Sequence, residues 1–282
     1  MSEASPFGER LLHAVRQRGT PACVGLDPFL DRVPGADAAD PAAAADAVRS
    51  FCLRVIDAVA PFVPAVKPQS ALFEQLGPAG VAAMNDAVRA ARDAGLVVIL
   101  DVKRGDIGST AEAYARAHLD DDGPTGADAI TVSPYPGPES FGPYERRVAA
   151  GKGAFVLVRT SNPGADVWQR AVAPAVADWL AQRCPGPGLG AFGAVVGATL
   201  PRDEVEALRA RMPRCWWLVP GFGAQGAGPD EVRPHFLADG TGALVTSSRG
   251  VLFPDRGVDA DLGAAVAERA RRFAEAVAGV AG

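Results

Sequence analysis

Eight short apolar runs, separated by longer stretches with helical spacing, constrain the fold of this chain more than any other feature. Each run has four to six residues and is rich in Val, Ile and Leu. Strands that are apolar on both faces need cover on both sides of their sheet, which crossover helices between parallel strands provide. Eight such units in 282 residues predict a (β/α)8 TIM barrel, an α/β fold. The expected strands are Ala22–Leu26, Phe62–Val66, Leu96–Asp101, Ala129–Val132, Ala154–Val158, Gly193–Val196, Trp216–Val219 and Ala243–Thr246.

The stretches between the runs carry Ala, Leu and Arg at helical spacing. An extra helix over Phe7–Arg18 is expected before the first strand. An open doubly wound sheet is the rival fold, but no GxGxxG motif follows the first strand. No segment is long and polar enough to be a linker, so we expect one domain over residues 1–282. The other expected helices include Pro41–Ala60, Pro78–Ala94, Thr110–His118, Asp166–Gln182, Asp203–Arg211 and Ala260–Ala278.

Composition excludes several classes of function. The 28 Lys and Arg against 33 Asp and Glu give a formal charge of −5, and no basic run is present, so a nucleic acid partner is not expected. No signal segment or bilayer-spanning apolar stretch is visible, which predicts a cytoplasmic protein without a membrane partner. The four cysteines lack CxxC spacing and the three histidines are scattered, so no metal site is expected.

Charged residues gather where the second and third expected strands end. Asp101 and Lys103 stand two positions apart, so strand geometry points both side chains toward the barrel mouth. Lys67 ends the neighbouring strand, and Asp106 follows the turn at Gly105. A solvated turn is the alternative for each residue alone. Together, two ammonium groups and two carboxylates at the end of a barrel where active sites form favour a catalytic array whose members keep one another ionised.

Glycines and an arginine follow the last two expected strands. Residues 220–226 read PGFGAQG, and residues 247–250 read SSRG. Glycines let backbone N–H groups approach an anion, and Arg249 adds a charge-assisted contact. This part of a TIM barrel is a frequent phosphate site, which we predict here, although a tight turn is the alternative for the glycine loop alone.

The segment VILDVKRGDIGST over Val98–Thr110 resembles the signature of the orotidine 5′-phosphate decarboxylase family. Other segments agree in order: GLD at 25–27, VKP at 66–68, RTSNPG at 159–164, and the PGFGAQG and SSRG loops. The resemblance runs from about Val24 to Val251, and ALFEQLG at 71–77 is similar to the long-chain bacterial group. It implies decarboxylation of orotidine 5′-monophosphate to uridine 5′-monophosphate and CO₂, a step of pyrimidine biosynthesis. It further implies a homodimer with shared active sites that needs neither cofactor nor metal.

The resemblance implies a catalytic role for each charged residue. Lys103 would protonate C6 of the pyrimidine as the carboxylate leaves, and Asp101 would lie against that carboxylate. Lys67 and Asp106 would complete a Lys-Asp-Lys-Asp array. A lysine held protonated by carboxylates is suited to donate a proton rather than to form a Schiff base.

The resemblance also implies the binding residues. Asp27 would hold the ribose hydroxyls and Ser161 the pyrimidine amide. Ile107 and Thr110, together with Asp106, would reach the site of the partner subunit. The residues expected around the phosphate are Pro220, Gly223, Gln225, Ser248 and Arg249.

Two other functions stay open. Sugar-phosphate decarboxylases or synthases of the wider barrel family share a D-x-K-x-x-D strand end but use Mg²⁺. They would need a further carboxylate at the end of the second strand, where this sequence reads KPQ at 67–69. A non-catalytic barrel that binds a nucleotide phosphate would combine an intact Arg249 loop with a degraded charge array, and all four charged residues are present here.

Overall fold

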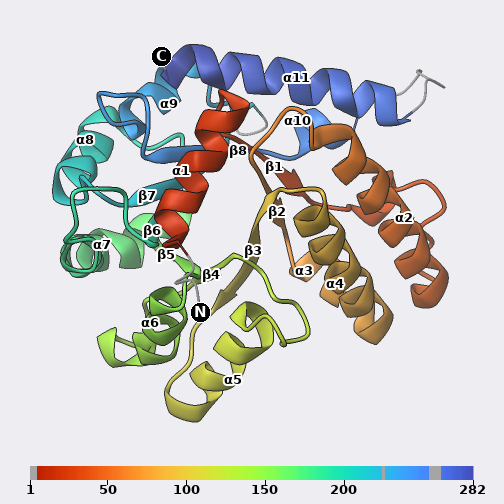
Figure 1. Ribbon diagram of the computed structural model, residues 1–282, viewed down its shortest axis with the longest axis horizontal. Coiled ribbons are helices and arrows are strands. Elements are labelled where there is room, and N and C mark those ends of the chain that lie inside the picture. Colours follow the sequence, from red (N-terminus) through yellow and green to blue (C-terminus); the bar gives the residue numbers. More distant parts are fainter. Residues whose placement is uncertain (1–4, 224–225, 254–261, 282) are drawn as a thin grey trace.

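The computed structural model describes residues 5–223, 226–253 and 262–281, which form a closed barrel of parallel strands in the order β1 to β8 (Figure 1). This architecture confirms the predicted TIM barrel. The strands are β1 (Ala22–Leu26), β2 (Ala65–Pro68), β3 (Val97–Arg104), β4 (Ala129–Val132), β5 (Gly153–Arg159), β6 (Phe192–Val196), β7 (Trp216–Pro220) and β8 (Ala243–Ser247).

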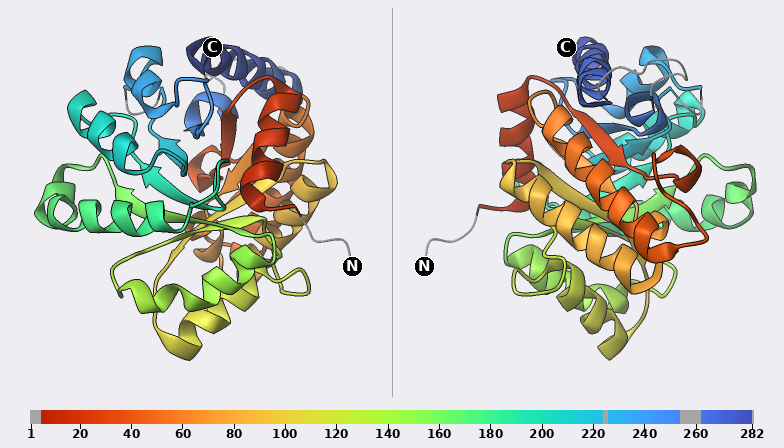
Figure 2. Two further views of the ribbon diagram at one scale, coloured as in Figure 1. Left: turned by 60° about the vertical axis from the view of Figure 1, so that its left-hand side comes forward. Right: turned by 90° about the vertical axis from the view of Figure 1, so that its right-hand side faces the viewer.

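Helices alternate with the strands and surround the barrel (Figure 2). They are α1 (Phe7–Arg18), α2 (Pro41–Val59), α3 (Ala71–Glu74), α4 (Gly77–Asp93), α5 (Gly108–Leu119), α6 (Gly142–Ala149), α7 (Asp166–Gln182), α8 (Arg202–Arg211), α9 (Pro229–Val232), α10 (Arg249–Leu252) and α11 (Leu262–Ala281). Short 3₁₀ helices cover Leu30–Arg32, Pro138–Phe141, Pro163–Ala165 and Arg233–His235. The predicted start of the last helix, Ala260, lies outside the described residues.

The second strand begins later than predicted. Phe62 and Val63 belong to the turn after α2, where their N–H groups donate to the carbonyl of Val59 at 2.9 and 3.2 Å. Pro64 follows and has no N–H to donate to a sheet, so β2 begins only at the next residue. The apolar run therefore included the turn that precedes the strand. The strand itself carries Lys67 to the barrel mouth.

Every second strand residue points into the barrel, and these side chains form one buried cluster. Ile99, Ala129, Val195, Leu218 and Leu244 belong to it, each from a different strand. The alternate residues pack outward against the helices in a second, larger cluster. The barrel interior is thus a packed core, as expected for eight strands. Polar side chains such as Lys67, Asp101 and Thr131 lie toward the carboxyl ends of the strands.

Helix α1 closes the amino-terminal end of the barrel and crosses the strands in Figure 1. Phe7 packs edge-on against Phe155, with ring centroids 6.0 Å apart. Gly153 makes room for this contact, because a Cβ there would lie 2.5 Å from the Phe7 ring. The indole N–H of Trp216 donates to the carbonyl of Gly8 at 3.1 Å. The extra helix predicted from the sequence therefore seals the end of the barrel opposite the polar strand ends.

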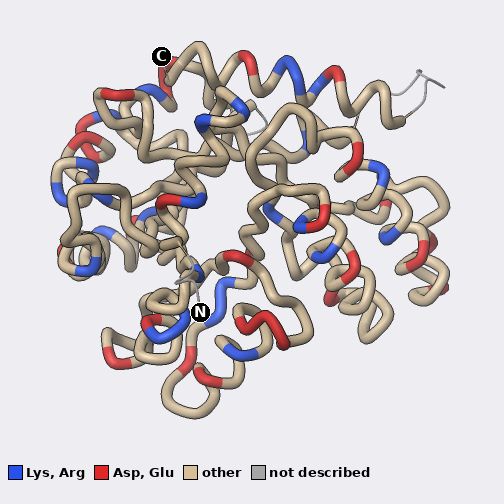
Figure 3. The backbone as a smooth tube through the Cα atoms, in the orientation of Figure 1, with Lys and Arg blue, Asp and Glu red and all other residues tan. Residues whose placement is uncertain are grey.

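Charged residues of both signs are interspersed along the outer helices, as the alternation along α11 shows (Figure 3). None of the helices in the described ranges has the length and apolar character that a bilayer-spanning segment requires.

Candidate active site

A cavity of about 630 Å³ opens at the carboxyl ends of the barrel strands. Its size is in the range that holds a small-molecule ligand. Eight of the residues predicted from the sequence line it: Asp27, Lys67, Asp101, Lys103, Ser161, Pro220, Ser248 and Arg249. Further polar residues, which were not predicted from the sequence, also line it: Gln69, Thr131, Thr160, Asn162, Thr199, Thr246 and Ser247.

Three charged side chains form a continuous set of ion pairs on the cavity wall. The ammonium of Lys67 donates to Asp101 Oδ2 at 2.7 Å, and that of Lys103 donates to Oδ1 at 2.6 Å. The side chains of Lys67 and Asp101 are 7% and 9% exposed, whereas that of Lys103 is 46% exposed. One carboxylate therefore holds a buried ammonium and an accessible one. Asp101 and Lys103 lie on the same side of β3, as their spacing predicts.

The pKa values of the buried pair are set by competition between burial and charge. Burial lowers the pKa of Lys67, but the carboxylates of Asp101 and Asp27 and the hydrogen bond to Asp101 outweigh it, and the pKa lies above its usual value. Burial raises the pKa of Asp101, but Lys67 and Lys103 outweigh it, and the pKa lies below its usual value. Both groups are therefore ionised at neutral pH.

Two polar residues that the sequence analysis did not select complete the contacts of Asp101. The amide of Gln69 donates to Oδ2 at 3.0 Å, and the hydroxyl of Thr131 donates to Oδ1 at 2.8 Å. Gln69 stands two positions after Lys67, and Thr131 lies on the inward face of β4. Both residues could have been predicted to face the barrel mouth from strand periodicity, because alternate positions share a face.

The ends of β7 and β8 contribute the predicted anion-binding residues. Pro220, Ser248 and Arg249 line the cavity, and Arg249 is exposed. Gly25 of β1 allows Ser248 to approach, because a Cβ at Gly25 would lie 2.0 Å from its hydroxyl oxygen. An exposed guanidinium beside a hydroxyl suits an anionic group such as a phosphate.

The loop after β7 differs in part from the prediction. The N–H of Gly223 donates to the carbonyl of Ala227 at 2.8 Å, so this amide is committed to the loop and does not face the cavity. Gly223 has a φ of 74°, a conformation that favours glycine, so its conformational freedom serves the turn. Gln225 lies outside the described residues.

Asp27 lines the cavity and has one side-chain acceptor without a partner. Its Oδ1 is buried and has no hydrogen-bond partner within the described ranges. A buried carboxylate oxygen without a donor is costly, so such atoms normally receive a hydrogen bond from protein, water or ligand. Asp27 is therefore suited to accept from hydroxyl groups of a ligand.

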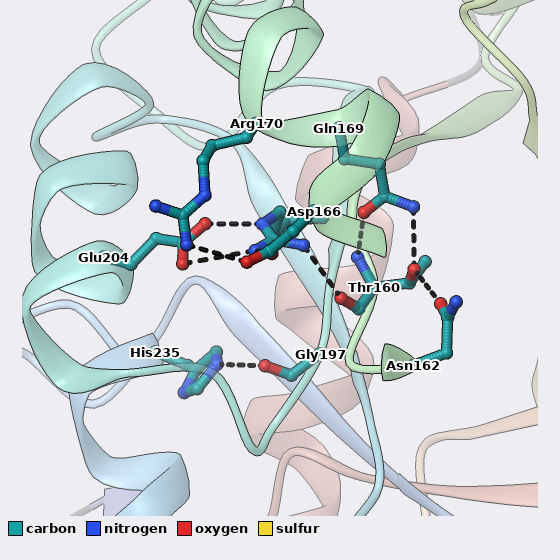
Figure 4. A network of polar contacts seen from close by, with 9 residues as sticks. Thr160, Asn162, Asp166, Gln169, Arg170, Gly197, Glu204 and His235 are labelled. Atoms are coloured by element: carbon teal, nitrogen blue, oxygen red, sulfur yellow. Dashed lines mark hydrogen bonds and ion pairs between the residues drawn. The ribbon is translucent and has the colours of Figure 1, made fainter. Parts of the chain in front are cut away.

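A network of polar contacts holds the segment that follows β5 (Figure 4). Arg159 is 3% exposed and pairs with Glu204 in α8 at 2.5 Å and with Asp166 at the start of α7. The N–H of Thr160 donates to the Gln169 side-chain oxygen at 2.7 Å. The chain leaving β5 is thereby tied to two helices just before it reaches Ser161.

Ser161 is packed against the end of β6. A Cβ at Gly197 would lie 2.9 Å from the Ser161 Cβ, so glycine is required for this approach. The carbonyl of Gly197 accepts from Nε2 of the buried His235 at 3.1 Å (Figure 4). Burial is the main cause that lowers the pKa of His235 to about 4, so the ring is neutral. The position of Ser161 is thus constrained from the β6 side, through Gly197.

Besides Gly223, three described residues of the predicted set do not line the cavity of their own chain. Asp106 accepts the N–H of Ile107 at 2.8 Å, and the Ile107 side chain is among the most exposed large apolar groups described, at 59%. Thr110 is exposed in the first turn of α5. One chain therefore assembles Lys67, Asp101 and Lys103, and the expected fourth member, Asp106, stands apart.

The charged array is not arranged to hold a divalent cation. Mg²⁺ requires several oxygen ligands, whereas both oxygens of Asp101 already accept from Lys67, Lys103, Gln69 and Thr131. No cluster of three or more His, Cys, Asp and Glu side chains suited to a metal occurs in the part of the chain that the structure describes. The donor set therefore disfavours the magnesium-dependent alternative.

The chain is similar to proteins of one family over nearly its whole length. The profile of the "Orotidine 5'-phosphate decarboxylase / HUMPS family" matches residues 21–256. A relative from Rhodopirellula baltica named orotidine 5′-phosphate decarboxylase is 46% identical over 270 residues, with 88% of each chain covered. A relative of the same name from Nocardioides sp. is 43% identical over 260 residues, covering 88% of this chain and 92% of its own.

Solved structures show the same similarity. A crystal structure from Streptomyces avermitilis matches with a TM-score of 0.86 and 38% identity, covering 100% of this chain and 97% of that one. The structure of Leishmania donovani OMP decarboxylase matches with a TM-score of 0.78 and 32% identity, covering 98% of this chain and 99% of that one.

Proposed function

Because the chain belongs to the orotidine 5′-phosphate decarboxylase / HUMPS family, we propose that it decarboxylates orotidine 5′-monophosphate to uridine 5′-monophosphate and CO₂. It is then a carboxy-lyase of pyrimidine biosynthesis. The observation that carries the proposal is the set of ion pairs Lys67–Asp101–Lys103 on the cavity wall. This array supplies an accessible, charged proton donor beside a fixed carboxylate.

Lys103 is the proton donor in this reaction. When the bond between C6 and the carboxylate breaks, its electron pair stays on C6, where no adjacent π system can take it up. An ammonium held at that position stabilises the developing charge and then transfers a proton to C6. The resulting neutral amine of Lys103 regains a proton from solvent, which its partly exposed side chain can reach.

Asp101 has two effects. It fixes the ammonium of Lys103 by the 2.6 Å contact, so no reorganisation is needed as charge develops. It also repels the carboxylate of the substrate, and this repulsion disappears once CO₂ departs. Lys67 neutralises Asp101 from the buried side and keeps it ionised.

The remaining groups bind the parts of the substrate that do not react. Arg249 and Ser248 hold the phosphate, near Pro220 and the segment containing Gly223 and Gln225. Asp27, which lines the cavity, accepts from the ribose hydroxyls. Ser161 contacts the pyrimidine amide. Binding energy from the remote phosphate then helps to hold the ring against the charged array.

The enzyme works as a homodimer with shared sites. Asp106, Ile107 and Thr110 are displayed on the surface beyond their own cavity, where they are available to a second copy. Tyr135 and Trp168, 81% and 69% exposed, line one hollow near the barrel mouth and offer apolar surface for such an interface. The four cysteines are free thiols, which suits the reducing cytoplasm.

Mixing two inactive variants tests the shared site. Lys103→Ala and Asp106→Ala chains are each inactive alone. After subunit exchange at equal concentrations, half of the dimers are hybrids with one complete site each, so about one quarter of wild-type activity returns. No recovery after exchange verified by mass spectrometry places Asp106 in the site of its own chain.

The activity itself is tested by following the ultraviolet absorbance of orotidine 5′-monophosphate with purified protein, with and without EDTA. We expect rapid loss of substrate absorbance that the chelator does not change. Activity that vanishes with EDTA would establish metal-dependent chemistry. No turnover by a folded protein that still binds uridine 5′-monophosphate would establish a binding protein, and either result contradicts the proposal.

A further inference from the structure

Thr131 is buried at the end of β4, with 1% of its surface exposed, and it lines the cavity next to the charged array. Its hydroxyl makes two hydrogen bonds. The oxygen accepts the backbone N–H of Lys103 at 2.9 Å, and the O–H donates to Asp101 Oδ1 at 2.8 Å. The Thr131 side chain therefore contacts both the backbone of Lys103 and the carboxylate of Asp101.

The pairing of β3 with β4 is irregular at this point. Leu100 is paired with Ile130 and Arg104 with Val132, so three residues of β3, 101–103, face the single residue Thr131. Such a bulge interrupts the regular ladder of backbone hydrogen bonds. The hydroxyl of Thr131 supplies the acceptor for the Lys103 N–H inside this irregular stretch.

Lys103 has a φ of 44°, the one positive φ found at a residue other than glycine within the described ranges. A side chain disfavours this conformation, which persists only where surrounding contacts impose it. The conformation turns the Lys103 ammonium back to Asp101 Oδ1 at 2.6 Å. The same oxygen accepts from Thr131, so the hydroxyl links the unusual backbone to the ion pair that depends on it.

We propose that Thr131 is a positioning residue, whose hydroxyl holds the 101–103 bulge in the conformation that aims the Lys103 ammonium into the cavity beside Asp101. The effect of the Thr131 hydroxyl on kcat rests on the function proposed above, whereas its effect on the Lys103 conformation does not. A valine has the same shape as threonine but can neither accept from the Lys103 N–H nor donate to Asp101.

Thr131→Val and Thr131→Ser separate the hydroxyl from the rest of the side chain. We expect Thr131→Val to lower kcat about 10- to 100-fold, while the affinity for uridine 5′-monophosphate stays within about threefold of wild type. Thr131→Ser should restore kcat to within about threefold of wild type. Thr20→Val is the stability control, because this buried hydroxyl donates to the carbonyl of Ala274 at 2.8 Å and does not line the cavity.

Crystal structures of wild type and Thr131→Val provide the readout that is independent of turnover. We expect Lys103 in the variant to leave positive φ and its ammonium to move beyond hydrogen-bond distance of Asp101. A variant that keeps both features and the wild-type kcat overturns the proposal, as does a Thr131→Ser enzyme as impaired as Thr131→Val. If wild type does not turn over orotidine 5′-monophosphate, the proposed function fails while the two structures still decide the role of Thr131.

Discussion

Lys67 on β2 and Asp101 on β3 form a buried ion pair with an N–O distance of 2.7 Å. Their side chains are 7% and 9% exposed, so water screens the attraction little. A second ammonium, that of Lys103, contacts the same carboxylate at 2.6 Å. The negative charge of Asp101 therefore allows two positively charged lysines to lie on one cavity wall.

Replacement of Asp101 by Asn should destabilise the protein. The change removes the carboxylate that contacts both the buried Lys67 ammonium and that of Lys103, and loss of one partner of a buried pair costs about 3–5 kcal/mol. We expect a decrease of about 3 kcal/mol in the free energy of unfolding in urea. Asp178→Asn is the control, since Asp178 pairs with Arg211 at the surface with 54% of its side chain exposed and should lose less than about 1 kcal/mol. Equal losses in the two variants would show that the Asp101 carboxylate does not stabilise the fold.

Two buried histidines should make stability depend on pH. Burial is the main cause that lowers the pKa values of His118 and His235 to about 4, from an ordinary value of 6.5. The unfolded chain therefore binds protons first as the pH falls from about 6.5 to 4, and the free energy of unfolding decreases over that window. Lys67 and Asp101 do not contribute to this slope. The raised pKa of Lys67 affects stability only above about pH 10.5, and the lowered pKa of Asp101 only below about pH 3.8.

Urea unfolding of wild type and His118→Gln at pH 7.5, 6 and 5 measures this effect. Removal of one titrating ring should reduce the slope by up to about 1.4 kcal/mol per pH unit. An unchanged slope means that His118 is not held neutral by the fold.

Replacement of Arg249 by Ala should weaken phosphate binding without affecting the reacting end of the substrate. A charge-assisted contact contributes about 1.5–3 kcal/mol, so the KM for orotidine 5′-monophosphate should rise about 10- to 100-fold. Turnover of orotidine, which lacks the phosphate, is the internal control and should not change. Equal impairment with both substrates would assign Arg249 a role other than phosphate binding.

Replacement of Arg159 by Met should loosen the segment that carries Ser161. The variant leaves Glu204 and Asp166 without their shared partner. We expect the affinity for uridine 5′-monophosphate to fall about tenfold while that for ribose 5-phosphate stays close to wild type, as measured by calorimetry. Arg170→Ala is the control, because Arg170 pairs with the same Asp166 but has 73% of its side chain exposed. Parallel losses for both ligands would indicate general loosening of the barrel.

The barrel was predictable from the sequence because strands buried on both faces read as continuous apolar runs. β1 and β4 have the predicted bounds. The limits of β2 were wrong, since the apolar run included Phe62 and Val63, which lie in a turn before Pro64. Apolar periodicity does not distinguish a buried turn from a buried strand.

The candidate site was predictable where it depended on strand ends, and less so where it depended on irregular backbone. The side shared by Asp101 and Lys103 followed from a spacing of two, but in the structure it also involves the bulge opposite Thr131 and the positive φ of Lys103. Strand periodicity places Thr131 on the inward face of β4, but no residue pattern predicts the bulge opposite it, so its contacts with Asp101 and Lys103 could not be predicted. The separation of Asp106 from the other three charges follows from how the chain leaves β3. Residue spacing does not encode it, and only the family resemblance implied that Asp106 would reach a partner subunit.

The most direct test of Lys103 as proton donor is the turnover of orotidine 5′-monophosphate by Lys103→Ala, with the affinity for uridine 5′-monophosphate measured on the same preparation. Loss of both the positioned charge and the proton predicts a decrease in kcat of about 10³-fold or more, with binding of uridine 5′-monophosphate still measurable. A Lys103→Ala enzyme that keeps kcat within about tenfold of wild type would contradict the mechanism.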